Sequence, residues 1–206
     1  VQKIRAALES KIQGEISVQQ ITGQPEVLVG TEIRDEKELN ANRQVIGIDP
    51  GLSTTGVGVV ERDETGRYRA LHIGTIEPDR KFNSALKLSH ISREIQALVA
   101  RFEPHCLAVE ETFYHKNVKS ALALGQARGA ALLAAAECGI EVMELSAKTV
   151  KQATVGNGAA AKEQVAVMIT ALLGLAQRPA SKDACDAAAV ALAALRRRAL
   201  PEIVRS

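Results

Sequence analysis

Three segments rich in Val, Ile and Gly follow one another after residue 43 and predict consecutive β-strands. They run over Val45–Asp49, Gly56–Arg62 and Tyr68–Ile76, and their apolar, β-branched composition is typical of strands. The turns between them, DPGLSTT and RDETGR, are short enough for hairpins. We therefore expect the first three strands to be antiparallel.

The rest of the chain alternates between helical spacing and short apolar strands. Apolar residues recur at helical intervals over 83–102, before Pro104, and predict an amphipathic helix. Further strands are predicted over 106–110 and 141–145, and further helices over 117–138, 162–173 and 182–198. The order β-β-β-α-β-α-β-α-α predicts an α/β fold with a mixed sheet.

The first 43 residues differ in composition from the rest of the chain. They are charged and Gln-rich, with one short helical pattern near Ile4–Ile12, so we expect a poorly ordered extension before a single domain over 44–206. Because the chain begins with Val, trimming and an artefact of the assigned start both stay open. We expect the extension to be dispensable.

Composition narrows the class of protein. No apolar run of the 206 residues approaches bilayer length and no signal pattern opens the chain, so we expect a cytoplasmic protein without a membrane segment. Three separated cysteines argue against a disulfide framework or a zinc site. A net charge of +2 neither requires nor excludes nucleic acid.

Acidic residues stand at two predicted strand ends and at the start of the last helix. Asp49 ends the first strand and Glu110 the fourth, while Asp183 and Asp186 are three apart and share a helix face. Clustered carboxylates repel one another, and Mg²⁺ relieves this by taking oxygen ligands. Two such ions about 4 Å apart can activate water and stabilise the leaving oxygen of a phosphodiester.

For each acid taken alone, a local structural role competes with metal binding. Asp in a DPG turn caps nearby amides, and acids in a first helical turn are favoured by the macrodipole. Glu110 after CLAV has no such capping role. From spacing alone, convergence of the four acids stays open.

Longer motifs carry a family resemblance. In chain order they are VIGIDPGLSTTGVGVV, AVEETFYHKNVKSALALGQARGAALLAAA, TVKQATVGNGAAAKEQV and KDACDAAAVALAAL. Together they resemble the RuvC family of Holliday junction resolvases, from about Gln44 to Leu195. The block around NVKSALALGQARGAA and the VKQ block are more specific than GIDPG.

The resemblance implies an RNase H-like fold with a mixed five-stranded sheet flanked by helices. It implies a homodimeric, Mg²⁺-dependent endonuclease of DNA recombination and repair, which nicks two strands of like polarity in a four-way junction and leaves ligatable ends. The implied catalytic and metal-binding carboxylates are Asp49, Glu110, Asp183 and Asp186, with two Mg²⁺ per subunit and Mn²⁺ as a substitute. RuvA and RuvB, the branch-migration complex, are the implied protein partners.

Basic residues outnumber acidic ones beside the predicted acids, as phosphate contacts require. The expected DNA-binding residues are Phe113, Lys116, Lys119, Arg128, Lys151 and Lys162. The resemblance places junction-contacting lysines at Lys151 and Lys162 and an aromatic wedge at Phe113. Helix lysines are usually only solvated, and a Phe more often packs in a core.

Gly125 and Gly129 lie one helical turn apart and have two interpretations. They allow close packing on the sheet, or contact with the same helix of a second subunit. The resemblance favours the second, and two-fold symmetry suits a junction with two equivalent strands.

Three other functions compete with junction cleavage. An actin-like ATP-binding module shares a DPG turn but needs two halves around the nucleotide, more than 206 residues supply. A junction-binding protein without activity would lack the acids. A related RNase H-like nuclease with another substrate is not excluded by the fold, since fold alone does not set function. The RuvC-type blocks disfavour it.

Overall fold

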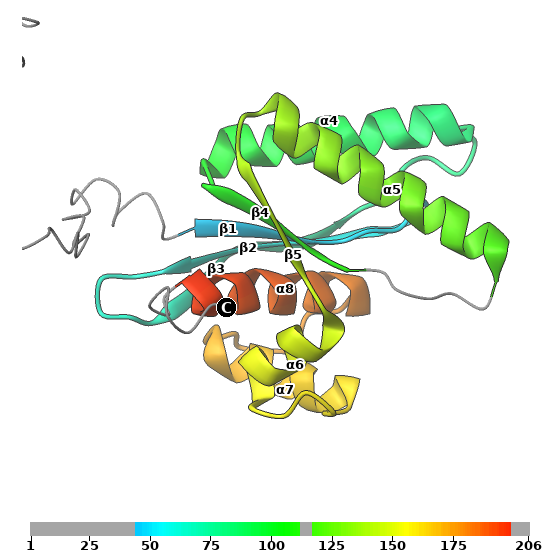
Figure 1. Ribbon diagram of the computed structural model, residues 1–206. Coiled ribbons are helices and arrows are strands. Elements are labelled where there is room, and N and C mark those ends of the chain that lie inside the picture. The colour runs from blue at the N-terminus through cyan, green and yellow to red at the C-terminus, as the bar shows by residue number, and fades with distance from the viewer. Residues whose placement is uncertain (1–43, 112–116, 199–206) are drawn as a thin grey trace, which may run out of the picture. The chain divides into compact units, whose positions relative to one another are not determined.

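A computed structural model describes residues 44–111 and 117–198, and its centre is one five-stranded mixed sheet (Figure 1). The strands are β1 (Gln44–Asp49), β2 (Thr55–Arg62), β3 (Tyr68–Ile76), β4 (Cys106–Glu110) and β5 (Glu141–Leu145). Their order is β3-β2-β1-β4-β5. The first three strands are antiparallel, while β4 lies parallel to β1 and β5 parallel to β4. The predicted α/β fold with its mixed sheet is confirmed.

Helices cover both faces of the sheet (Figure 1). The helices are α4 (Ser84–Phe102), α5 (Val118–Glu137), α6 (Ala147–Val155), α7 (Lys162–Leu172) and α8 (Lys182–Arg198). α4 and α5 lie on one face, α8 lies directly on the other, and α6 and α7 pack against the far side of α8. Within the described part of the chain, no helix is long and apolar enough to cross a membrane.

The predicted elements agree with the structure to within two residues, apart from one omission. The sequence prediction was wrong at one place, because it left out α6. The β-branched Thr149, Val150 and Thr154 lower the helix propensity of this segment. Its N-terminus does carry a signal, because the Ser146 side chain accepts a hydrogen bond from the Thr149 amide.

Strand alternation divides the core into two clusters. On β1, Val45 faces α8, whereas Ile46 and Ile48 face α4 and α5. On β4, Cys106 and Ala108 likewise lie in the cluster with α8. Because side chains alternate along a strand, Asp49 and Glu110, the last residues of β1 and β4, also lie on the α8 side.

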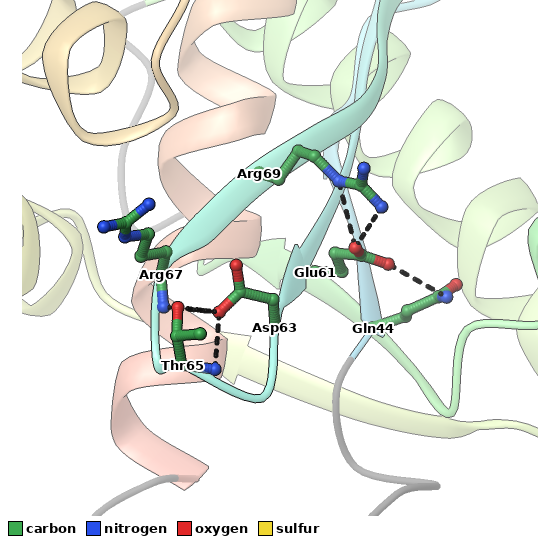
Figure 2. A network of polar contacts seen from close by, with 6 residues as sticks. All are labelled: Gln44, Glu61, Asp63, Thr65, Arg67 and Arg69. Carbon is green, nitrogen blue, oxygen red and sulfur yellow. Dashed lines mark hydrogen bonds and ion pairs between the residues drawn. The ribbon is translucent and has the colours of Figure 1, made fainter.

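The β2–β3 hairpin is held by a polar network (Figure 2). Asp63 Oδ1 accepts hydrogen bonds from the amides of Thr65 and Arg67, both at 2.9 Å, and from the Thr65 hydroxyl. These bonds lower the pKa of Asp63, the Thr65 hydroxyl most strongly. Arg69 and Glu61 face each other across the strands with a nitrogen–oxygen distance of 2.5 Å. The network fixes the hairpin register at the end of the sheet remote from Asp49.

α8 approaches β1 and β2 more closely than ordinary side chains permit. A Cβ added at Gly47 would lie 2.2 Å from the carbonyl oxygen of Ala187, and one at Gly58 would lie 2.6 Å from the Cα of Ala188. Backbone therefore packs directly on backbone. The Ala-rich sequence of α8 permits this contact, and the residues from Ala187 to Leu195 are all buried.

Arginines in the last turn of α8 anchor its C-terminal end. Arg196 donates a hydrogen bond to the carbonyl of Ala153 in α6, and its guanidinium lies 5.3 Å from the ring centroid of Tyr68. Arg198 forms an ion pair with Glu141 at the start of β5. These contacts tie α8 to α6, β3 and β5.

His105, just before β4, is expected to make the fold acid-sensitive. Both ring nitrogens are buried without a hydrogen-bond partner among the described residues, and burial, helped by the charge of Arg198, lowers the pKa of His105 to about 4. The unfolded chain binds a proton on this side chain from about pH 6.5 downward, but the folded chain does so only near pH 4. Stability is therefore lost as pH falls through this window.

Urea unfolding of the wild type and of His105→Gln at several pH values measures this effect. Above pH 7 the difference in unfolding free energy between the two should be constant. Between pH 6.5 and 4 the wild type should lose stability relative to the variant. A difference that stays constant over the whole range would contradict the prediction.

Candidate active site

Two carboxylates end neighbouring parallel strands on the same face of the sheet. Asp49 is the last residue of β1 and Glu110 the last of β4, and the register pairs Ile48 with Val109 immediately before them. Since Ile48 and Val109 face α4 and α5, the two acids face α8.

The first turn of α8 brings the other two acids to this edge. Gly56 of β2 lies opposite Asp49 in the antiparallel register, and the backbone carbonyl of Asp183 lies directly over Gly56. Asp186 follows one turn later, on the same side of the helix. The structure thus brings together all four carboxylates that the sequence predicts.

Asp49 is the most strongly perturbed of these acids. Burial raises the pKa of Asp49 to about 7, and the negative charges of Asp186, Asp183 and Glu110 act in the same direction. The charged form of Asp49 is therefore disfavoured by desolvation and by repulsion together. A cation placed among the four carboxylates would relieve both effects.

Lys162, the first residue of α7, supplies positive charge within this cluster. Its Nζ lies 2.7 Å from Asp186 Oδ2, and the two side chains are 74% and 24% exposed. The hydrogen bond to Asp186 raises the pKa of Lys162. Burial raises the pKa of Glu110, while Lys162 and Lys151 oppose that rise. Both lysines therefore lie within electrostatic reach of the carboxylates.

The donor chemistry at this edge fits a hard divalent cation. All four acids offer oxygen ligands, which Mg²⁺ prefers, and the disfavoured charge of Asp49 favours a cation there. Among the described residues, no three His, Cys, Asp or Glu side chains already stand close enough to form a complete ligand set. The carboxylates of Asp183, Asp186 and Glu110 all act electrostatically on Asp49, and Asp186 is paired with Lys162.

The turn after Asp49 is closed by its own hydrogen bonds. The buried Thr55 donates its hydroxyl to the carbonyl of Gly51 at 2.7 Å. A Cβ at Gly51 would lie 2.2 Å from the carbonyl oxygen of Thr54, so only glycine fits. This turn gives Asp49 a fixed backbone.

The predicted DNA-binding residues fall into four groups. Lys151 and Lys162 lie beside the carboxylates, whereas Lys119 is exposed in the first turn of α5. Arg128 forms an ion pair with Glu144 between α5 and β5, so part of its charge is neutralised within the subunit. The predicted Phe113 and Lys116 lie outside the described residues.

Sequence reasoning missed two contacts that shape this edge. It treated Lys162 as a DNA contact only, and the ion pair with Asp186 joins residues 24 apart. It also missed Gln152, which donates to the carbonyl of Gly156 at 2.8 Å and accepts from the amide of Gly158 at 3.0 Å. These bonds close the loop that leads to α7. The VKQ block contains Gln152, but no local pattern indicates its partners.

The sheet order and the helices on both faces define an RNase H-like α/β protein. The chain belongs to the RuvC family: the family profile of the crossover junction endodeoxyribonuclease RuvC matches residues 45–194.

Individual relatives agree with this assignment. The crossover junction endodeoxyribonuclease RuvC of Syntrophomonas wolfei is 47% identical over 149 residues, which cover 72% of this chain and 86% of that protein. The RuvC of Moorella thermoacetica is 46% identical over 148 residues, covering 72% and 88%. The structure of T. thermophilus RuvC in complex with a Holliday junction substrate matches with a TM-score of 0.70 at 36% identity, covering 73% of this chain and 92% of that one.

Asp49→Asn should stabilise the protein when divalent ions are removed by EDTA. At pH 8 the substitution takes away a charge that burial and three neighbouring acids disfavour. We expect the free energy of unfolding to rise by about 2 kcal/mol, measured by urea denaturation. Asp79→Asn, at an exposed acid in the β3–α4 loop, is the matched control and should change little. Equal stability of the two variants would contradict the repulsion among the four acids.

Proposed function

We propose that this protein is a structure-selective endonuclease that resolves Holliday junctions in the cytoplasm during DNA recombination and repair. It makes paired, metal-dependent nicks in two strands of like polarity and leaves ligatable ends. Residues 44–206 are the nuclease domain, and residues 1–43 are an extension dispensable for cleavage.

One observation carries the proposal. Asp49, Glu110, Asp183 and Asp186 come from three separate elements and meet at one edge of the sheet, where the pKa of Asp49 rises to about 7. A fold gains no stability from repulsion among carboxylates, so their convergence favours a catalytic role. Membership of the RuvC family gives that role its reaction class.

The four carboxylates would hold Mg²⁺, two ions per subunit, with Mn²⁺ as a substitute. Bound there, the metal would supply Lewis acidity and lower the pKa of water. Asp49 and Glu110 hold their positions through β1 and β4, and Asp183 and Asp186 through α8. Rigid elements would therefore hold the backbone of each proposed ligand in place before DNA arrives.

Basic side chains would seat the DNA backbone across this edge. Lys151 and Lys162 are nearest to the carboxylates, and Lys119 is exposed on α5. An exposed ion pair contributes only about 0–1 kcal/mol, so Lys162 can leave Asp186 for a phosphate at small cost. Arg128, Lys116 and a stacking Phe113 complete the proposed contact set.

A second copy of the chain would pack on the outer face of α5. Val118, Leu122 and Leu133 are 74%, 64% and 55% exposed, and with Gly125 and Gly129 they repeat every three or four residues, along one face. Among the described residues, no atom of another element lies within 4 Å of a Cβ added at either glycine, so these glycines do not pack on the described part of their own subunit. Exposed apolar faces of this kind mark protein interfaces.

A two-fold dimer would place two sites on two equivalent strands of a four-way junction. Association with RuvA and RuvB remains a prediction from the family resemblance.

The decisive test is cleavage of a labelled, mobile four-way junction in Mg²⁺. The wild type should make paired nicks in the junction and leave a linear duplex intact. Asp49→Asn should slow nicking by about 10³-fold, because metal catalysis accounts for several kcal/mol of the barrier, while junction binding persists. Asp79→Asn and a chain that starts at Asn42 should both retain activity. Binding without cleavage in any divalent metal would contradict the enzyme assignment.

Leu122→Asp should weaken dimerisation. A buried carboxylate at the centre of an apolar interface lacks a partner, so we expect the dimer dissociation constant to rise by about tenfold or more, as measured by analytical ultracentrifugation. Val167→Asp, at another exposed apolar residue on α7, is the control. Equal dimer affinity of the two variants would place the interface elsewhere.

A further inference from the structure

Gly56 lies at the point where β2 meets the first turn of α8. In the antiparallel register it is the direct partner of Asp49. A Cβ added at Gly56 would lie 2.0 Å from the carbonyl oxygen of Asp183, 2.3 Å from its carbonyl carbon and 3.0 Å from the amide of Ala184. The backbone of Asp183 therefore fills the space that a side chain at Gly56 would need.

No rotamer change can accommodate a side chain at this position. The obstructing atoms are all backbone, and interiors are packed without room to yield. Any Cβ would push the first turn of α8 away from β2 by about 1 Å or more, since such contacts are not made below 3.0 Å. Asp49 would stay in place on β1, so the separation between Asp49 and Asp183 would increase.

We propose that Gly56 is a positioning residue for the metal site: by admitting the Asp183 backbone onto β2, it sets the distance between the carboxylate of α8 and that of β1. The inference rests on the proposed function, because it assigns Gly56 to the metal site proposed for the four carboxylates. A ligand moved by 1 Å disturbs Mg²⁺ strongly, since this ion demands near-ideal octahedral geometry at about 2.0–2.1 Å.

Val57 supplies a matched control on the same strand. It is the next residue of β2, is fully buried and faces α4 and α5 instead of α8. Val57→Ala destabilises the fold by leaving a cavity but leaves the contact between β2 and α8 in place. A comparison with Gly56→Ala therefore separates loss of stability from loss of ligand geometry.

The experiment measures Mg²⁺ response in two ways, as the shift of the thermal unfolding midpoint with metal alone and as the Mg²⁺ concentration that half-saturates junction nicking. For Gly56→Ala we expect two quantities to rise tenfold or more: the apparent Mg²⁺ dissociation constant obtained from the midpoint shift and the Mg²⁺ concentration that half-saturates nicking. For Val57→Ala both should stay within twofold of the wild type. Adding Asp183→Glu to Gly56→Ala should recover part of the response, because the longer side chain restores reach.

Should Gly56→Ala fail to fold, Asp183→Glu alone tests the same point. With the Asp183 backbone fixed on β2, the extra methylene moves the carboxylate past its position in the wild type. The Mg²⁺ concentration that half-saturates nicking should therefore rise. A response within twofold of the wild type would overturn the proposal.

The outcomes distinguish this inference from the proposed function. Equal Mg²⁺ responses of Gly56→Ala and Val57→Ala, with the response abolished in Asp49→Asn, would overturn the role of Gly56 and leave the metal site standing. A wild type that shows no Mg²⁺ response by either readout would overturn both.

Discussion

The contact between α8 and the glycines of β1 and β2 is the constraint on which the rest of the structure depends. With side chains at Gly47, Gly56 and Gly58, α8 could not rest its backbone on the strands. The Ala-rich helix is instead buried from Ala187 to Leu195, with the sheet on one side and α6 and α7 on the other. A helix placed this tightly carries its first turn to the end of β1, and the acids of both elements meet there.

This arrangement concentrates unfavourable charge at one edge of an otherwise well-packed fold. Two apolar clusters, one on each face of the sheet, contain fully buried aliphatic side chains such as Ile46 and Leu192. Each such side chain contributes about 1.5–3 kcal/mol by burial. That stability offsets the burial of Asp49 and the repulsion from its neighbouring acids, which together raise the pKa of Asp49. Sites that violate local rules while the rest of the fold obeys them are typically functional.

Much of the fold was predictable because strand and helix periodicity is a local property. The strand ends at Asp49 and Glu110, and the three-residue spacing of Asp183 and Asp186, follow from the sequence; β5 and α8 were predicted with their observed bounds. α6 was missed because its β-branched residues obscure a helix stabilised by tertiary contacts.

The rest of the site depends on contacts that no local pattern encodes. In the sequence, Gly56 is one more small residue in an apolar strand. Its packing role is visible only in the structure, where the Asp183 backbone lies over it. Lys162 pairs with a residue 24 positions away, and among the described residues no atom of another element lies within 4 Å of a Cβ added at Gly125 or Gly129, which favours the proposed contact with a second subunit. Close approach and charge pairing are properties of the assembled layers.

The two faces of the sheet have different proposed roles, one in catalysis and the other in dimerisation. The α8 face holds the carboxylates, whereas α5, on the opposite face, presents the apolar surface proposed for the second subunit. β4 links them, because Glu110 ends that strand and Val118 begins α5 eight residues later (118 − 110). Eight residues span at most about 28 Å even when fully extended. The start of the proposed interface is therefore tied to Glu110, so a two-fold dimer built on this interface would have a bounded separation between its two sites.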